Sequence, residues 1–160
     1  MACFLQTIGA VDGFLKKGAE HLGANANEVV ETRLFADMLP FRFQVVSAAH
    51  HSLGAIKGVQ AGLAGPPGPS TADYAGLQKL IADTKAGLEA LKPGDVNALE
   101  GKDVVFQIGD RKLPFKAEGF LLSFSLPNFH FHATTAYDIL RMKGVPLGKR
   151  DYLGRMLMAS

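Results

Sequence analysis

Apolar residues recur at helical spacing through long stretches of this chain, and breaks rich in glycine and proline separate the stretches. This spacing predicts amphipathic α-helices that each bury one apolar face. A first helix is expected from about residue 3 to Leu22. A second is expected from Met38 to about Leu63, with Asp37 as its N-cap. Pro40 then falls in the first turn, where a missing N–H is tolerated.

The segment "GPPGPS" separates the second helix from a third. Ser70 or Thr71 is expected to cap the third helix, which ends at "KPGD". Its apolar stripe is formed by Tyr74, Leu77, Ile81, Leu88 and Leu91.

The apolar period changes from helical to two-residue in "DVVFQIGDRKLPF". Val104, Phe106 and Ile108 alternate on one side, and Leu113 and Phe115 lie across the turn from them. With Gly109-Asp110 between the two runs, this pattern predicts a β-hairpin with a tight turn. A fourth helix is expected from about Ala117 to Lys143, with a kink at Pro127. The tail after it is too rich in glycine and proline for another long helix.

Four amphipathic helices, with a small β-hairpin before the last one, indicate an all-α four-helix bundle. A length of 160 residues fits a single domain over residues 1–160. We therefore expect one hydrophobic core.

Composition restricts the partners and the location of the chain. The 17 Lys and Arg residues nearly balance the 15 Asp and Glu residues, so the formal net charge is only +2. Neither nucleic acid nor an anionic membrane is expected as a partner, and no apolar run is long enough to span a bilayer. The single cysteine, Cys3, excludes an internal disulfide and fits a cytoplasmic location, although a disulfide-free periplasmic protein would have the same composition.

Two histidines in "LPNFHFHATTAYDILR" raise the question of a metal or catalytic centre. Residues two apart on an α-helix point about 200° apart, so His130 and His132 cannot chelate one ion from a helix. His132 shares an apolar-ended stripe with Asn128 and is expected to face inward. His130 is expected to be exposed.

The second helix supplies partners for His132. A flank of small and polar residues there includes Gln44 and His51, about two turns apart, and could face the fourth helix. His50 points elsewhere and is expected at the surface. Two readings of Gln44, Asn128 and His132 remain open. They form either a buried hydrogen-bond network that fixes helix register or part of a ligand pocket.

The chain resembles a known family through "RLFADMLPFRFQV" and "LPNFHFHATTAYDILRMKGVPLGKRDYLG". These segments are similar to an uncharacterised domain-of-unknown-function family of the DinB/YfiT-like superfamily. The resemblance implies a DinB-type four-helix bundle that is often dimeric. Many superfamily members look like metal-dependent enzymes, with one histidine on the second helix and an H-x-x-x-H pair on the last. Several are implied to be transferases or isomerases that use small thiols.

Carried onto this sequence, the implied pair falls on Asn128 and His132, and the remaining histidine falls on Gln44 or, alternatively, His51. Amides are weak ligands for zinc or nickel, so the resemblance implies a degenerate metal site.

Three functional hypotheses follow. The first is a homodimeric small-molecule-binding or stress-related protein with a pocket around Gln44, His51, Asn128 and His132, and no cofactor. The alternative is a metal- or thiol-dependent transferase or isomerase, in which His132 and His51 bind a divalent metal such as zinc or nickel. In the third, the polar residues only specify helix register, and the dimer surface carries the function.

Overall fold

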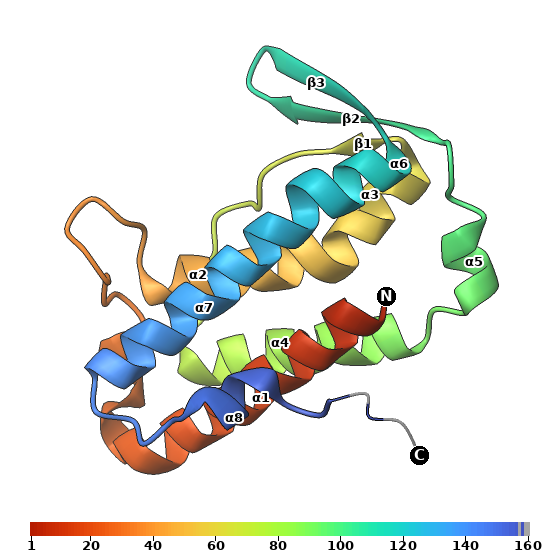
Figure 1. Cartoon of the computed structure of the whole chain (residues 1–160). Helices are drawn as coiled ribbons and strands as arrows, with labels where there is room; N and C mark the ends of the chain where they lie inside the picture. Colours follow the sequence, from red (N-terminus) through yellow and green to blue (C-terminus); the bar gives the residue numbers. More distant parts are fainter. Residues whose placement is uncertain (157, 159–160) are drawn as a thin grey trace.

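A computed structural model describes residues 1–156 and 158. Those residues form a mostly helical fold with a small three-stranded sheet at one end (Figure 1). No helix within this part of the chain is long and apolar enough to cross a membrane.

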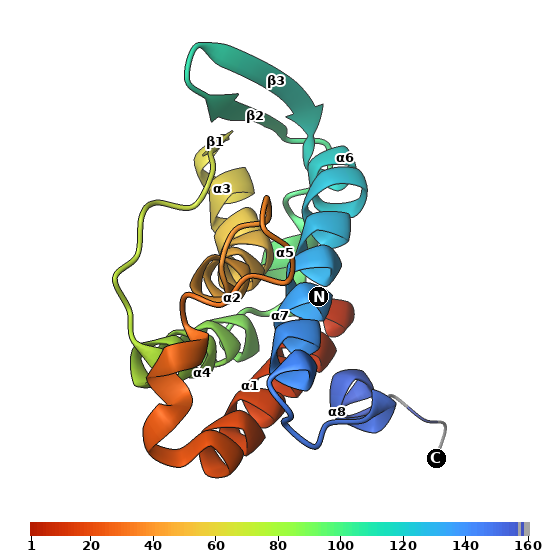
Figure 2. The same cartoon turned by 90° about the vertical axis from the view of Figure 1, so that its left-hand side faces the viewer.

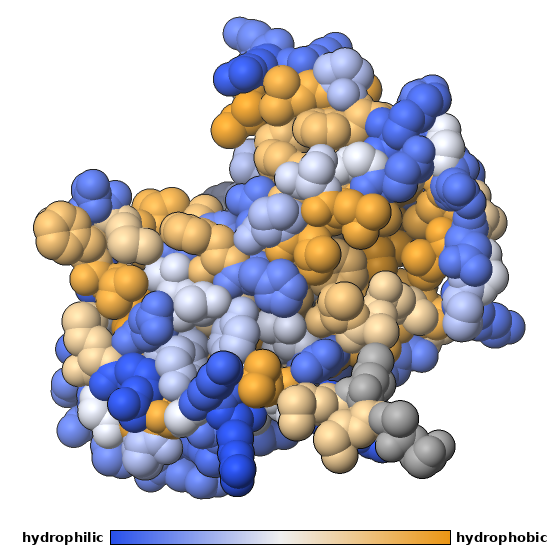
Figure 3. Space-filling model, in the orientation of Figure 1, coloured by the Kyte–Doolittle hydropathy of each residue, from blue (hydrophilic) through white to orange (hydrophobic). Residues whose placement is uncertain are grey.

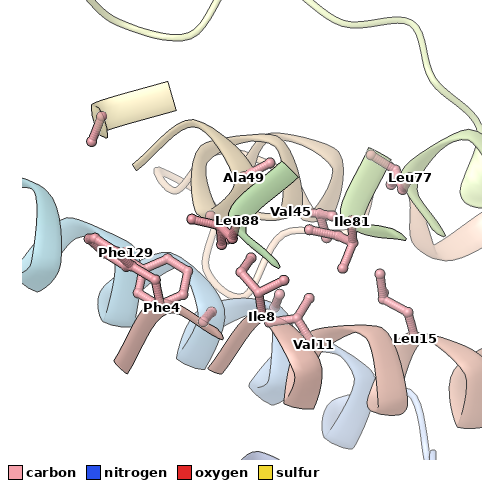
Figure 4. Close-up of a cluster of buried hydrophobic side chains, with 14 of the residues drawn as sticks. Phe4, Ile8, Val11, Leu15, Val45, Ala49, Leu77, Ile81, Leu88 and Phe129 are labelled. Atoms are coloured by element: carbon pink, nitrogen blue, oxygen red, sulfur yellow. The ribbon is translucent and has the colours of Figure 1, made fainter. Parts of the chain in front are cut away.

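The first helix, α1, runs from Ala2 to Leu22, as the periodicity predicts. Its stripe of Phe4, Ile8, Val11 and Leu15 is buried. A 3-10 helix, Gly23–Val29, continues from it. Figure 4 shows this stripe facing residues of α2 and α4 across the core.

The second helical segment begins later than predicted. Helix α2 spans Phe41–Ala49, and Pro40 is its N-cap in an extended conformation rather than a first-turn residue. A proline disfavours helical geometry at the residue before it, so Leu39 and the residues preceding it stay outside the helix. Asp37 therefore does not cap the helix.

The same segment continues beyond α2 through a π-helical turn. This turn, η2, covers His50–Gly54, and α3 follows over Ala55–Ala61. Gly62 ends α3 with a left-handed φ of 73°, which glycine adopts without steric cost.

Helix α4 spans Tyr74–Glu89 and is capped by Asp73, not by Ser70 or Thr71. The Asp73 Oδ1 atom accepts a hydrogen bond from the Gly76 N–H at 2.8 Å. A short helix that the sequence did not predict, α5, follows over Pro93–Asn97.

The predicted hairpin is confirmed. Strand β2, Asp103–Ile108, pairs antiparallel with β3, Arg111–Lys116, and Ile108 faces Arg111 across the turn. A third strand was not predicted. The two-residue β1, Leu63–Ala64, pairs in parallel with β2 and ties the end of α3 to the hairpin.

The last long helical segment covers residues 117–142 in three parts. Helix α6, Ala117–Gly119, leads into a π-helical turn, η3, over Phe120–Ser125, and α7 covers Leu126–Met142. The π turn ends just before Pro127, whose missing N–H interrupts the regular hydrogen-bond ladder. A short α8, Lys149–Leu153, follows and packs on α1.

Within the described residues, the long helical segments pack around one core. Helix α2 packs chiefly on α7 and also on α4, while α1 packs on α4, α7 and α8. Figure 2 shows α7 beside α2, with α1 and α4 at the lower end of the molecule. The α2–α7 pair brings the polar residues of the two helices together.

Candidate functional site

A hydrogen bond between two buried side chains joins the centres of α2 and α7. The Nδ1 atom of His132 lies 2.7 Å from the Oε1 atom of Gln44. The other end of the amide is also fixed, because Gln44 Nε2 donates to the carbonyl oxygen of Leu39 at 2.7 Å. The sequence therefore correctly placed His132 inward and Gln44 on the flank that faces it.

These contacts define the tautomer of His132. Its partner atom on Gln44 is a carbonyl oxygen, which only accepts, so Nδ1 of His132 carries the hydrogen. Burial lowers the pKa of His132 from 6.5 to about 4, so the ring is neutral near pH 7. The Nε2 atom then carries a free lone pair and, among the described residues, has no hydrogen-bond partner.

His51, on the π-helical turn η2 that follows α2, lies against His132 of α7. The two rings are nearly parallel, with an interplanar angle of 9° and centroids 5.8 Å apart. Phe124 meets His51 edge-on at 5.8 Å. Burial, together with the neighbouring imidazoles of His50 and His132, lowers the pKa of His51 to about 3. The site thus holds two adjacent neutral imidazoles.

Asn128 does not join this pair through a hydrogen bond. It is half-buried, and its Nδ2 atom donates to the carbonyl oxygen of Phe124, one turn earlier on its own helix, at 2.7 Å. Its amide thus bonds back to the preceding turn η3 of the same helical segment rather than to Gln44 or His132.

The neighbouring histidines differ from the expectations for them. His50 is half-buried rather than a free surface residue, and its Nε2 atom lies 2.7 Å from the carbonyl oxygen of Gly65. His130 is also half-buried, with the hydroxyl of Tyr152 at 3.4 Å from its Nδ1 atom. The unpredicted helix α8 carries Tyr152, which explains why exposure of His130 could not be judged from its own helix.

A hydroxyl without a partner lies on the same stripe of α2. Ser47 is three residues after Gln44 and four before His51, so it shares their helix face. Its Oγ atom is wholly buried and makes no hydrogen bond among the described residues. A buried hydroxyl in this state costs free energy unless a water or ligand supplies a partner.

A cavity of about 300 Å³ lies directly beside His51. It is bounded by both π-helical turns, since η2 contributes His51 and η3 contributes Phe120. Such turns are frequent at functional sites. The complete lining is His50, His51, Gly54, Ala55, Lys57, Gly58, Leu63, Ala64, Gly65 and Phe120. The sequence did not predict this cavity. A sign of it there is Gly58, one of the small residues on the flank of the second predicted helix, which lines the cavity.

Comparisons with known proteins establish the family. The sequence profile of the family described as "Domain of unknown function (DUF1993)" matches residues 1–153. The chain belongs to this family. A crystal structure of a DinB family member protein from Shewanella denitrificans is similar to this DUF1993 domain, with a TM-score of 0.78 and 24% sequence identity. The similarity covers 99% of this chain and 92% of the other and shows a shared DinB-like fold. None of the curated proteins matches significantly.

The described residues of the DUF1993 domain do not supply the donor set of a three-histidine metal centre. Gln44 Oε1 is occupied by the His132 N–H, and the amide of Asn128 is bonded to its own helix. Among the described residues, no group of three or more His, Cys, Asp or Glu side chains could hold a metal ion. His51 and His132 alone do not fit a tight zinc or nickel site, which uses at least three protein ligands. Gln44 acts here as a positioning residue for His132.

Proposed function

We propose that this DUF1993 domain binds a small molecule at the junction of the α2–α7 polar contact and the cavity beside His51. The observation that carries the proposal is His51 itself. Its neutral imidazole lies on His132, lines the cavity and has no hydrogen-bond partner among the described residues. A concave, mostly apolar space with a few oriented polar groups is the usual form of a ligand site.

The surroundings of His51 support a preorganised site. Gln44 fixes the tautomer of His132, and His132 in turn holds His51 between itself and Phe124. A pure register network would satisfy its own donors and acceptors. In this structure three polar groups have no hydrogen-bond partner among the described residues: the His51 ring, Nε2 of His132 and Oγ of Ser47. We further propose that the long helical segments are the four helices of a DinB-type bundle.

A thermal-shift screen of small organic compounds tests the proposal. Compounds that raise the melting temperature are then titrated against the His51→Ala and His21→Ala variants. His21 is an exposed histidine outside the cavity and serves as the matched control. We expect loss of binding in His51→Ala only. Binding that is equal in both variants would contradict the proposed site.

A metal- or thiol-dependent transferase is the second candidate. Two adjacent neutral imidazoles favour it, because neutral imidazole is a good ligand for zinc and nickel. The incomplete donor set weighs against it. Elemental analysis of protein purified without a histidine tag or added metal distinguishes the two candidates.

Association into a homodimer is a separate proposal, supported by exposed apolar side chains. The hydrogen bond from Gln44 to Leu39 brings the loop before α2 towards the part of α7 that carries His132. Leu39 and Phe35 on this loop, and Phe131 on α7, are all exposed. Figure 3 shows apolar surface over this loop, at the left of the view, and a further apolar area between α7 and α5. Light scattering coupled to gel filtration tests the proposal, and Phe131→Ser should favour the monomer. A monomeric wild-type chain would contradict it.

A further inference from the structure

The charges around the cavity beside His51 are all positive or neutral. Lys57 lines the cavity, and no Asp or Glu does so among the described residues. Its ammonium group is exposed and has no carboxylate within 4.0 Å in that part of the chain. Acids on neighbouring elements are paired elsewhere, Asp83 with Lys79 and Asp103 with Lys116, each at 2.7 Å.

The cavity also presents one free neutral donor. A neutral imidazole always carries one N–H, and no described residue accepts that of His51. His50 differs, because its Nε2–H donates to the carbonyl oxygen of Gly65 at 2.7 Å. Lys57 and His51 therefore supply two donors without acceptors, from positions six residues apart on one helical segment.

The remaining walls are apolar and restrict the size of a ligand. Phe120, Ala55 and Leu63 contribute hydrocarbon surface. At Gly58 a Cβ atom would come within 2.9 Å of the Ala64 Cβ, so β1 packs as closely as a glycine permits. A cavity of about 300 Å³ is at the lower end of the range for ligand sites, which suits a small compound.

We infer that the cavity between the two π-helical turns binds a small organic carboxylate. One carboxylate oxygen accepts from the Lys57 ammonium group, the other accepts from the free N–H of His51, and the hydrocarbon part lies against Phe120. This inference rests on the proposed function and specifies the ligand class of the same site. Charge-assisted hydrogen bonds of this kind are about twice as strong as neutral ones.

Matched pairs of compounds test the inference. Acetate, butyrate, hexanoate, benzoate and phenylacetate are each titrated by calorimetry beside the corresponding primary amide. The amides retain the shape and one acceptor oxygen, but an NH₂ donor replaces the second oxygen and the charge is lost. We expect at least one carboxylate to bind at least about tenfold more tightly than its amide, because loss of a charge-assisted hydrogen bond has this order of effect.

Variants of single lysines then test whether the carboxylate binds beside Lys57. In Lys57→Gln the preference for that carboxylate should disappear. In Lys143→Gln, which removes the same charge from an exposed lysine after α7, the preference should remain. Loss in both variants would indicate only a general effect of net charge and would overturn the inference.

The outcomes separate this inference from the proposed function. Equal binding of carboxylates and amides, with loss in His51→Ala, would overturn the carboxylate class and leave the His51 site intact. If no carboxylate binds but uncharged compounds from the wider screen bind at His51, the carboxylate class is again overturned and the His51 site is left intact. Failure of all compounds in both experiments would overturn the inference and the proposed function together.

Discussion

The Nδ1 atom of His132 on α7 lies 2.7 Å from the Oε1 atom of Gln44 on α2, and both side chains are buried. This bond links helices whose contact residues are 88 positions apart in the sequence. It also directs the free lone pair of His132 to Nε2. An amide that would be a weak metal ligand thus has a definite role in orienting a histidine.

Removal of the Gln44 amide should be more costly than removal of the Asn128 amide. The Gln44→Leu variant leaves the buried N–H of His132 without an acceptor, so its free energy of unfolding should fall by about 1–3 kcal/mol. The Asn128→Leu variant is the matched control, because Asn128 is half-buried and bonds only to its own helix. Urea unfolding measures both. A larger loss in Asn128→Leu would contradict the assigned roles.

The stability of the protein should depend on pH through His51 and His132. Their folded-state pKa values, about 3 and about 4, lie below the ordinary value of 6.5. The unfolded chain therefore binds protons that the folded chain does not. Stability should be insensitive to these groups above about pH 6.5 and should fall as the pH drops towards about 4. At about 1.4 kcal/mol per pKa unit, the two shifts correspond to a combined loss of about 6 kcal/mol by pH 4.

Single-histidine variants isolate this effect. His132→Gln should reduce the slope of unfolding free energy between about pH 6.5 and 5, where most carboxylates remain ionised. His21→Gln, at an exposed position, should retain the wild-type slope. A slope that is the same in all three proteins would show that the buried imidazoles do not control it.

Gly18 should not tolerate a methyl group, because a side chain from another helix occupies the space. A Cβ atom there would overlap the hydroxyl of Tyr74, which donates to the carbonyl oxygen of Leu15 at 2.9 Å. Gly18→Ala should lower the free energy of unfolding by about 1–3 kcal/mol through strain or loss of this bond.

Gly13→Ala is the matched control for that experiment. Gly13 lies on the same helix, and apart from the adjacent residues and the backbone of that helix no described atom lies within 4 Å of a Cβ there. Alanine at this position should therefore stabilise α1 by up to about 1 kcal/mol. Thermal unfolding compares the two variants. Equal effects of the same sign would contradict the packing around Tyr74.

Metal content should be well below one zinc or nickel ion per chain in protein purified without added metal. The reason is the donor set, in which His51 and His132 lack a third side-chain ligand among the described residues. Mass spectrometric elemental analysis measures the content. About one tightly held ion per chain, lost in His132→Ala, would favour the transferase candidate instead.

The helices could be predicted because their cause is local. Periodicity identified α1 within a residue or two, and a change of period identified the β2–β3 hairpin. The errors were at the starts of α2 and α4 and in the short helix α5, which was not predicted. Several residues before α2 and α4 could act as caps, and the choice of Asp73 over Ser70 depends on the path of the loop.

The site could be predicted only in part, because its geometry depends on contacts between distant segments. The helix faces predicted from the sequence put Gln44 and His51 opposite His132, and the structure has contacts from both residues to His132. They could not show that Asn128 bonds within its own helix. The cavity depends on two π-helical turns and on β1, which pairs with residues about forty positions later. Neither feature leaves a periodic pattern in the sequence.

The most direct test of the account is nitrogen-15 NMR of the histidine side chains during addition of the compounds selected by thermal shift. The spectrum without ligand should show neutral His132 with its hydrogen on Nδ1. Addition of a ligand should shift the His51 resonances in a saturable manner and leave those of His21 unchanged. Saturable binding without any change at His51 or His132 would contradict the claim that these neighbouring imidazoles form the ligand site.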